Sequence, residues 1–244
     1  MMDRKVMLST TDADGVWRQS LPATEASSTP HLLTFNASTG ETAFMENVLF
    51  GDVYLCGGQS NMQFSMPAIT NASDEIALAD KYPLIRIFTV GQGTSSPTPI
   101  PDLQTVEQPW SVASAQTVAV GGGFGYFSAV CWIFGRELFD ALGASVPIGL
   151  ISNNWGGTPV ESWTTPAALA ACNVTVVDSA LYNAMIHPYT VGPMALLGFT
   201  WYQGEANVDE RPGDEGAARY ACTFPGMISQ WRRAFDAPAA LFGF

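Results

Sequence analysis

Residues 53–66, VYLCGGQSNMQFSM, decide how the rest of the chain is interpreted. A short apolar run meets the glycine pair Gly57 and Gly58 and then a polar group that contains Ser60. Glycines let a buried strand turn sharply, and a serine just past it presents its Oγ and its own N–H to a substrate. Ser60 is therefore the candidate nucleophile. The alternative is an ordinary strand-to-helix turn, because Met62 replaces the second glycine of the hydrolase elbow G-x-S-x-G.

The composition is that of a globular protein. Of the 244 residues, 47% are hydrophobic and 13% are charged, which is enough for one large domain or one domain and a fragment. The net charge is -12 and the ten Lys and Arg residues are scattered, so a nucleic-acid partner is not expected. No apolar run has the length of a membrane span, so no membrane span is expected.

Signals for cellular location disagree. The first 15 residues lack the apolar stretch of a signal peptide, which taken literally predicts a cytosolic protein. Asn36, Asn71 and Asn173 each begin an Asn-x-Ser/Thr pattern, which is glycosylated only on the secretory route.

Nothing in the sequence predicts a metal or a cofactor. The cysteines have neither metal-ligand spacing nor a C-x-x-C pair, so buried free thiols are expected at Cys56, Cys131, Cys172 and Cys222. The glycine run at 121–125, GGGFG, fits neither G-x-G-x-x-G nor the P-loop pattern. Hinge or close-packing glycines are predicted there.

Residues 1–50 are typical of short antiparallel strands. Strands are expected at residues 5–9, 16–21 and 31–36, with turns at 12–15 and 38–40. These pieces are too few to cover both faces of a sandwich. Residues 1–45 are either the remnant of a larger β domain or a small cap on the main domain.

From residue 46 to residue 244, strands alternate with helices. Strands are expected at residues 53–56, 82–90, 147–152, 196–202 and 241–244. Helices are expected at 128–143, and at 219–235 with an interruption at Pro225. This alternation predicts an α/β domain with a mostly parallel sheet covered on both faces.

Two finer expectations concern the segments between these strands. Residues 91–116 are rich in Pro, Ser and Thr and predict a long surface loop. The helix at 128–143 is expected to bury one apolar stripe made of Val130, Ile133, Phe134, Leu138 and Leu142.

Polar loops follow three of the expected strands: GGQSNM, NNWGGTPVES and QGEANVDE. In α/β proteins with parallel sheets, ligands bind at the carboxyl ends of the strands. Acyl transfer by a serine needs donors for an oxyanion, and Gly157 can supply a backbone N–H and Gln203 a side-chain amide. Gln203 and Glu205 are interpreted as site residues, with a solvated loop as the alternative.

Three motifs together resemble the sialate O-acetylesterase family of SGNH hydrolases, close to the acetylxylan-esterase-like group: GGQSNM, NNWGGTPVESW and WYQGEAN. The stretches YNAMIHPY and FSAVCWIFGREL are also similar to it. The resemblance covers residues 46–244 and implies a three-layer, flavodoxin-like α/β/α domain. It also implies that residues 1–45 are the last strands of a preceding β-sandwich domain, and that the parent family is secreted or lysosomal.

The resemblance implies a substrate and a set of roles. The substrate is an O-acetylated glycan or sialic acid, and Ser60 forms an acetyl-enzyme intermediate. The oxyanion hole consists of Ser60 itself, Gly157 and Gln203. Substrate binding or loop support is implied for Gln59, Asn61, Trp155, Glu205 and Asn207. Trp155, Trp163 and Trp201 pack around the glycan or in the core.

The general base of this family lies in a D-x-x-H or D-x-H segment after the fifth strand. The two histidines, His31 and His187, lack that acidic residue before them, and His187 is expected to be packed or hydrogen-bonded instead. A serine without its base is a poor nucleophile. The chain as given is therefore expected to be truncated at both ends and catalytically crippled, with a glycan-binding pseudoenzyme or an incomplete gene product as alternatives.

Overall fold

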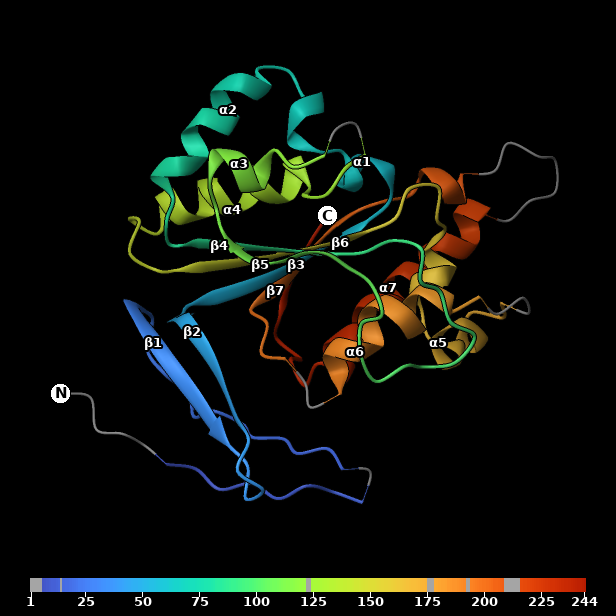
Figure 1. Cartoon of the computed structure of the whole chain (residues 1–244). Coiled ribbons are helices and arrows are strands. Elements are labelled where there is room, and N and C mark those ends of the chain that lie inside the picture. The colour runs from blue at the N-terminus through green and yellow to red at the C-terminus, as the bar shows by residue number, and fades with distance from the viewer. Residues whose placement is uncertain (1–5, 14, 122–123, 175–177, 192–193, 209–215) are drawn as a thin grey trace.

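The computed structural model describes residues 6–13, 15–121, 124–174, 178–191, 194–208 and 216–244. Within these residues a six-stranded sheet of order β5-β4-β6-β3-β7-β8 forms the middle layer (Figure 1). Its strands are β3 (Asp52–Gly58), β4 (Ile85–Val90), β5 (Val106–Val112), β6 (Ile148–Asn154), β7 (Gly198–Tyr202) and β8 (Leu241–Gly243). Among the described strands of this six-stranded sheet, only β5 is antiparallel to its neighbour, so the predicted mostly parallel α/β sheet is confirmed.

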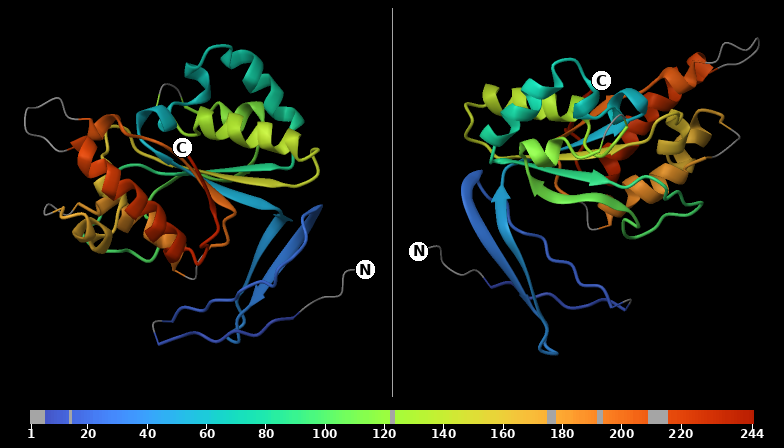
Figure 2. Two further views of the ribbon diagram at one scale, coloured as in Figure 1. Left: turned by 180° about the vertical axis from the view of Figure 1, so that it is seen from behind. Right: turned by 45° about the horizontal axis from the view of Figure 1, so that its top comes forward.

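Helices cover both faces of this sheet, as Figure 2 also shows from behind. On one face lie α1 (Ser60–Gln63), α2 (Ala72–Leu78), α3 (Ala115–Val118) and α4 (Ala129–Ala141). On the other lie α5 (Pro166–Ala171), α6 (His187–Thr190) and α7 (Gly216–Ala234). Successive β3 side chains point to opposite faces, so Leu55 joins one buried cluster, while Tyr54 and Cys56 join the other.

A separate hairpin precedes the main sheet and projects away from it (Figure 1). Its strands β1 (Ser27–Asn36) and β2 (Thr42–Phe50) pair antiparallel, which confirms the strand expected at 31–36. The strand expected at 16–21 is wrong, and residues 6–9 form none either, because neither segment pairs with a neighbour in the described chain. Residue 5 lies outside the described residues. The division at residue 45 stays a prediction.

The surface loop expected at 91–116 is partly wrong. It contains β5, which pairs antiparallel with β4, and the first residues of α3. Pro109 lies within β5, and a proline is tolerated there because β5 is an edge strand. The Pro, Ser and Thr content that predicted a loop is compatible with such an edge.

The helix expected at 128–143 is confirmed as α4, and its predicted apolar stripe is only partly wrong, because Ile133, Phe134 and Leu138 pack against a core cluster. Val130 and Leu142 are 36% and 39% exposed, and the residues that are buried instead are Ala129, Cys131, Trp132, Gly135 and Phe139. Small residues let this helix lie close to the sheet, since a Cβ on Gly135 would be 2.4 Å from Leu150 Cδ1. The apolar stripe predicted from the sequence therefore lies beside the face of α4 that contacts the sheet.

The expectation of free thiols is also wrong, because all four cysteines form disulfides. Cys56 of β3 pairs with Cys131 of α4, and Cys172 pairs with Cys222 of α7. The packing of the helices on the sheet brings each pair to a Cα–Cα distance of 5.8 Å, which is within disulfide reach.

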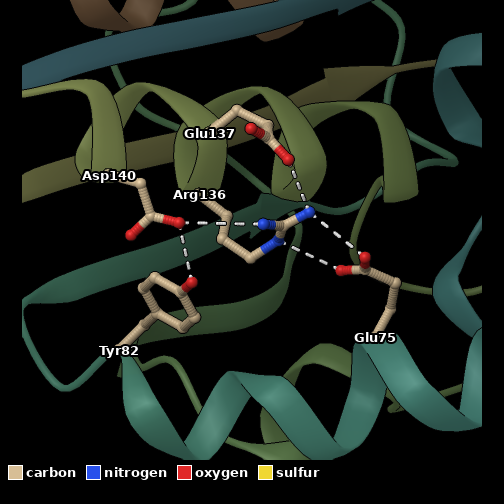
Figure 3. A network of polar contacts seen from close by, with 5 residues as sticks. All are labelled: Glu75, Tyr82, Arg136, Glu137 and Asp140. Atoms are coloured by element: carbon tan, nitrogen blue, oxygen red, sulfur yellow. Dashed lines mark hydrogen bonds and ion pairs between the residues drawn. The ribbon is translucent and has the colours of Figure 1, made fainter.

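A charged network joins α2 to α4 at the surface of the upper layer. Figure 3 shows the Arg136 guanidinium between Glu75 of α2 and Asp140 of α4. Its Nε and Nη2 donate to the two carboxylate oxygens of Glu75, both at 3.1 Å, and Tyr82 donates to Asp140 at 2.9 Å. The Arg136 side chain is only 12% exposed, so this bidentate pair fixes α2 against α4.

Candidate active site

Ser60 lies at the first position of α1, directly after β3, at the carboxyl edge of the sheet. β3 lies between β6 and β7, and Gly58 pairs in register with both Asn154 and Tyr202. The segments that follow β6 and β7 therefore begin beside the segment that carries Ser60. The sequence predicted this meeting of three polar loops, and the sheet order explains it.

Gly58 is the residue that permits this close approach. Its φ is +141°, and a Cβ there would lie 2.1 Å from the Tyr202 carbonyl oxygen. Gln59 N donates to Tyr202 O at 3.0 Å, and Trp155 N donates to Gly58 O at 3.0 Å. The serine loop is thus tied on both sides through backbone atoms, which leaves no room for a side chain at this position.

Two backbone N–H groups near Ser60 are free in the described part of the chain. The N–H of Ser60 belongs to the first turn of α1, where backbone donors have no intrahelical partner. The N–H of the exposed Gly157 also makes no hydrogen bond with a described residue. Its neighbour Gly156 lies against the serine, since a Cβ there would be 3.5 Å from Ser60 Cβ. Free donors beside a hydroxyl are the requirement for an oxyanion hole.

Gln203 lies in the predicted loop, but its amide is engaged there. Its Nε2 donates to Thr158 O at 3.2 Å and to Asn207 Oδ1 at 2.8 Å, so both hydrogens are used. Asn207 Oδ1 also accepts from Val160 N at 2.9 Å, and its Nδ2 donates to Glu161 at 2.7 Å, which fixes the amide orientations. In this arrangement Gln203 joins the loops after β6 and β7. Its role as an oxyanion donor stays a prediction.

The other predicted residues connect the serine loop to the loop after β7. Gln59 is buried, and its Oε1 accepts from Ala206 N at 3.0 Å. Asn61 is exposed, and its Nδ2 donates to the carboxylate of Glu205. These contacts connect the two loops, and a role of the exposed Asn61 and Glu205 in substrate binding stays a prediction.

Tyr220 of α7 touches the same loop. Burial raises the pKa of its phenol, and the charges of Glu205 and Glu161 raise that pKa further. The phenol therefore stays protonated near neutral pH, and its OH donates to the Gln203 carbonyl at 3.4 Å.

The tryptophans divide between core and site. Trp163 and Trp201 are 0% and 3% exposed and meet edge to face at 5.9 Å, so both belong to the core. Trp155 is half-buried in the loop after β6 and packs against a core cluster, so its contact with a glycan stays a prediction.

Neither histidine contacts Ser60. His187 Nδ1 lies 2.9 Å from the Ile100 carbonyl oxygen, which confirms that this histidine is hydrogen-bonded within the fold. His31 lies in β1, where its ring meets Phe50 edge to face. Among the described residues no side chain hydrogen bonds with Ser60 Oγ.

A cavity of about 340 Å³ lies beside the site, within the range of small-ligand pockets. Its described lining mixes polar, aromatic and small apolar residues: Thr89, Val90, Gln92, Glu107, Gly121, Phe124, Gly125, Tyr126 and Asn154. Phe124, one of the lining residues, is 54% exposed, and its ring meets Phe64 edge to face at 5.5 Å. Part of the glycine run at 121–125, residues 122–123, lies outside the described residues.

The described residues contain no group of three or more His, Cys, Asp or Glu side chains that is placed to hold a metal ion. None of the helices in this part of the chain has the length and apolar character needed to cross a membrane.

Residues that the sequence reasoning missed are Gln63 and Glu161. Gln63 ends α1, and its amide contacts Gly156, Gln92 and Phe124. A polar residue three positions after the serine was the signal that could have pointed to it. Glu161 lies within the quoted NNWGGTPVES motif, and it holds the Asn207 amide.

Comparison with known proteins identifies the family. The family model described as carbohydrate esterase, sialic acid-specific acetylesterase, matches residues 50–242. The chain belongs to this family. The resemblance read from the three motifs is thereby confirmed.

Relatives within this family are longer than the chain. It is 41% identical over 207 residues to the sialate O-acetylesterase of Homo sapiens, covering 80% of this chain and 38% of that protein. It is 38% identical over 238 residues to the sialate O-acetylesterase of Rattus norvegicus, covering 81% and 42%. The chain thus spans about two fifths of the length of these relatives.

A solved structure supports the fold. The crystal structure of a carbohydrate acetylesterase from Xanthomonas citri superposes with a TM-score of 0.80 at 33% identity, covering 95% of this chain and 49% of that one. The expected α/β architecture of the carbohydrate esterases is therefore the fold of this chain.

Proposed function

We propose that this protein is a carbohydrate O-acetylesterase of the sialate O-acetylesterase type, in which Ser60 attacks the acetyl carbonyl. The observation that carries the proposal is the position of Ser60 at the carboxyl edge of the sheet, with its own N–H free among the described residues and with Gly156 of the glycine turn packed against it. Family membership supports the same reaction class. The substrate would be an O-acetylated glycan or sialic acid.

In the proposed reaction the Ser60 Oγ forms a bond to the acetyl carbon while its proton passes to a base. The carbonyl electrons move onto the oxygen, which accepts hydrogen bonds from the Ser60 and Gly157 N–H groups. The ester C–O bond then breaks, and the sugar hydroxyl leaves with a proton. Water attacks the acetyl-Ser60 ester by the same steps, which releases acetate and restores the serine.

The base is the component that the described residues do not supply. His187 is bonded to a backbone carbonyl and His31 lies in the hairpin. Under the resemblance the base belongs to a D-x-x-H segment. We therefore expect slow turnover by the 244-residue chain, and we expect imidazole in solution to accelerate acetyl transfer through Ser60.

The cavity beside the site is the proposed place for the sugar ring. Phe124→Ala should raise the KM for an O-acetylated sialoside about tenfold, because it removes an exposed aromatic face from the lining. The kcat/KM for p-nitrophenyl acetate, which carries no sugar, should change less than about twofold. Phe44→Ala, at a similarly exposed ring on β2, is the control that should change neither. Equal effects of Phe124→Ala on both substrates would contradict this assignment.

A secretory location is proposed on separate grounds. Two disulfides pair all four cysteines, as is usual in oxidising compartments, and Asn36, Asn71 and Asn173 are exposed. Expression through the secretory route of an animal cell should give a protein whose mass falls on treatment with an N-glycosidase. Retention of the protein in the cytosol with reduced cysteines would contradict the proposal.

A glycan-binding protein without catalysis is the second candidate. The observation in its favour is that no described side chain bonds to Ser60 Oγ. It predicts saturable binding of acetylated glycans and no Ser60-dependent turnover, with or without imidazole.

A further inference from the structure

Gln63 connects the serine helix to the glycine turn. It is the last residue of α1, three positions after Ser60, and it is only 6% exposed. Its Oε1 accepts from Gly156 N at 2.7 Å. Its Nε2 donates to Gln92 Oε1 at 3.0 Å and to the Phe124 carbonyl at 3.2 Å. One acceptor contact and both amide hydrogens are therefore engaged.

The contacts determine which way the Gln63 amide faces. Gly156 N–H can only donate and the Phe124 carbonyl can only accept, so a flipped amide would oppose like groups at both ends. Gln92 is oriented in the same way, because its Nε2 donates to Asn154 O at 2.9 Å and leaves its Oε1 for Gln63. The network has one arrangement in which every bond is made.

This arrangement decides which backbone donor of the glycine turn stays free. The Gly156 N–H donates to Gln63 Oε1. The N–H of Gly157, whose φ is +75°, makes no hydrogen bond with a described residue. A Cβ on Gly156 would lie 2.9 Å from Gln63 Oε1 and 3.5 Å from Ser60 Cβ, so the turn lies against both residues.

We propose that Gln63 is a positioning residue for acyl transfer, which holds the Gly156–Gly157 turn against Ser60 so that the Gly157 N–H is presented to the acetyl oxyanion. This inference rests on the proposed esterase function for its catalytic meaning. Gln63 touches no reacting atom, and it acts through the turn. An oxyanion donor acts through placement, and a misplacement of about 1 Å can cost about 10²-fold in rate.

Two substitutions separate the contacts of Gln63. Gln63→Met keeps the side-chain length and loses all three hydrogen bonds, so the turn is released. Gln63→Glu keeps an acceptor for Gly156 N–H, and because burial against two acceptors favours the protonated carboxyl, its O–H can replace one of the two donor contacts to Gln92 and Phe124. The glutamate should therefore recover part of what the methionine loses.

Gln108→Met is the matched control. Gln108 is also 6% exposed, and its amide donates to Thr117 O at 3.0 Å and accepts from Thr89. It lies on β5, at the edge of the sheet away from Ser60. The same chemical change is thus made at a buried glutamine that has no contact with the glycine turn.

The experiment measures two quantities for each full-length variant. The first is kcat and KM for p-nitrophenyl acetate with imidazole present, and the second is amide hydrogen exchange at Gly156. Gln63→Met should lower kcat about 10- to 100-fold with KM within about twofold, and should speed exchange at Gly156 about tenfold or more. Gln63→Glu should fall between it and the wild type. Gln108→Met should match the wild type in both.

The inference is overturned if Gln63→Met leaves kcat unchanged, whatever happens to exchange, because Gln63 would then serve the fold alone. It is also overturned if Gln108→Met loses as much as Gln63→Met, since the effect would be general destabilisation. A wild type without any Ser60-dependent cleavage defeats the proposed function itself. If amide exchange at Gly156 is unchanged in Gln63→Met, Gln63 does not hold the turn, and this outcome is independent of whether Ser60-dependent cleavage occurs.

Discussion

Ser60→Ala is expected to reduce the imidazole-assisted cleavage of p-nitrophenyl acetate to the rate of imidazole without protein. The loss in kcat/KM should be at least about 10²-fold, because removing a serine nucleophile removes the covalent route entirely. The Ser60 hydroxyl lies at the first turn of α1, and Gly156 of the glycine turn packs against its side chain. The measurement is the initial rate of nitrophenolate release across a range of imidazole concentrations.

With imidazole as the added base, this experiment tests the nucleophile without depending on a base in the protein. Imidazole supplies the proton acceptor that the described residues lack at Ser60 Oγ, so the wild-type rate should rise with imidazole more steeply than the protein-free rate. Ser145→Ala is the control, since Ser145 lies after α4 and its hydroxyl bonds to Leu142 O. If Ser60→Ala responds to imidazole as the wild type does, Ser60 is not the nucleophile.

Gly58→Ala is expected to destabilise the fold by more than about 3 kcal/mol or to prevent folding. The new Cβ would lie 2.1 Å from the Tyr202 carbonyl oxygen, and φ at this position is +141°. Relief would require β3 to separate from β7, which breaks the bond from Gln59 N to Tyr202 O. The measurement is urea denaturation followed by tryptophan fluorescence.

Gly40→Ala is the matched control for this variant. Gly40 also has a positive φ, of +104°, but its Cβ would meet nothing within 4 Å. The free energy of unfolding of Gly40→Ala should fall by about 1 kcal/mol, from backbone strain alone. The difference between the two variants measures the close approach at Gly58. If Gly58→Ala is no less stable than Gly40→Ala, the tight contact between the serine loop and β7 is wrong.

Much of the architecture follows from the sequence because its pattern is local. Apolar runs that end in polar loops predicted β3, β6 and β7, and parallel pairing then brings their ends together at one edge. β5 was missed because an edge strand tolerates Pro109 and polar residues. The buried face of α4 was predicted only in part, because Gly135, which lies close to Leu150 of the sheet, has no side chain that an apolar pattern could show.

What could not be predicted depends on contacts between distant residues. The disulfides join cysteines that are 75 and 50 positions apart, and only the packing of helices on the sheet pairs them. Gln203 was correctly placed at the edge of the sheet, yet its amide hydrogens are taken by Thr158 and Asn207. Gln63 lies within residues 53–66, but its role could not be predicted because its hydrogen-bond partners lie on three other loops.

Peptide mapping by mass spectrometry after incubation with a fluorophosphonate and imidazole shows directly whether Ser60 is the nucleophile. We expect one adduct, on Ser60, that is absent from Ser60→Ala and forms more slowly in Gln63→Met than in Gln108→Met. An adduct on another residue, or no adduct on Ser60 under conditions that label a serine esterase control, would contradict this assignment.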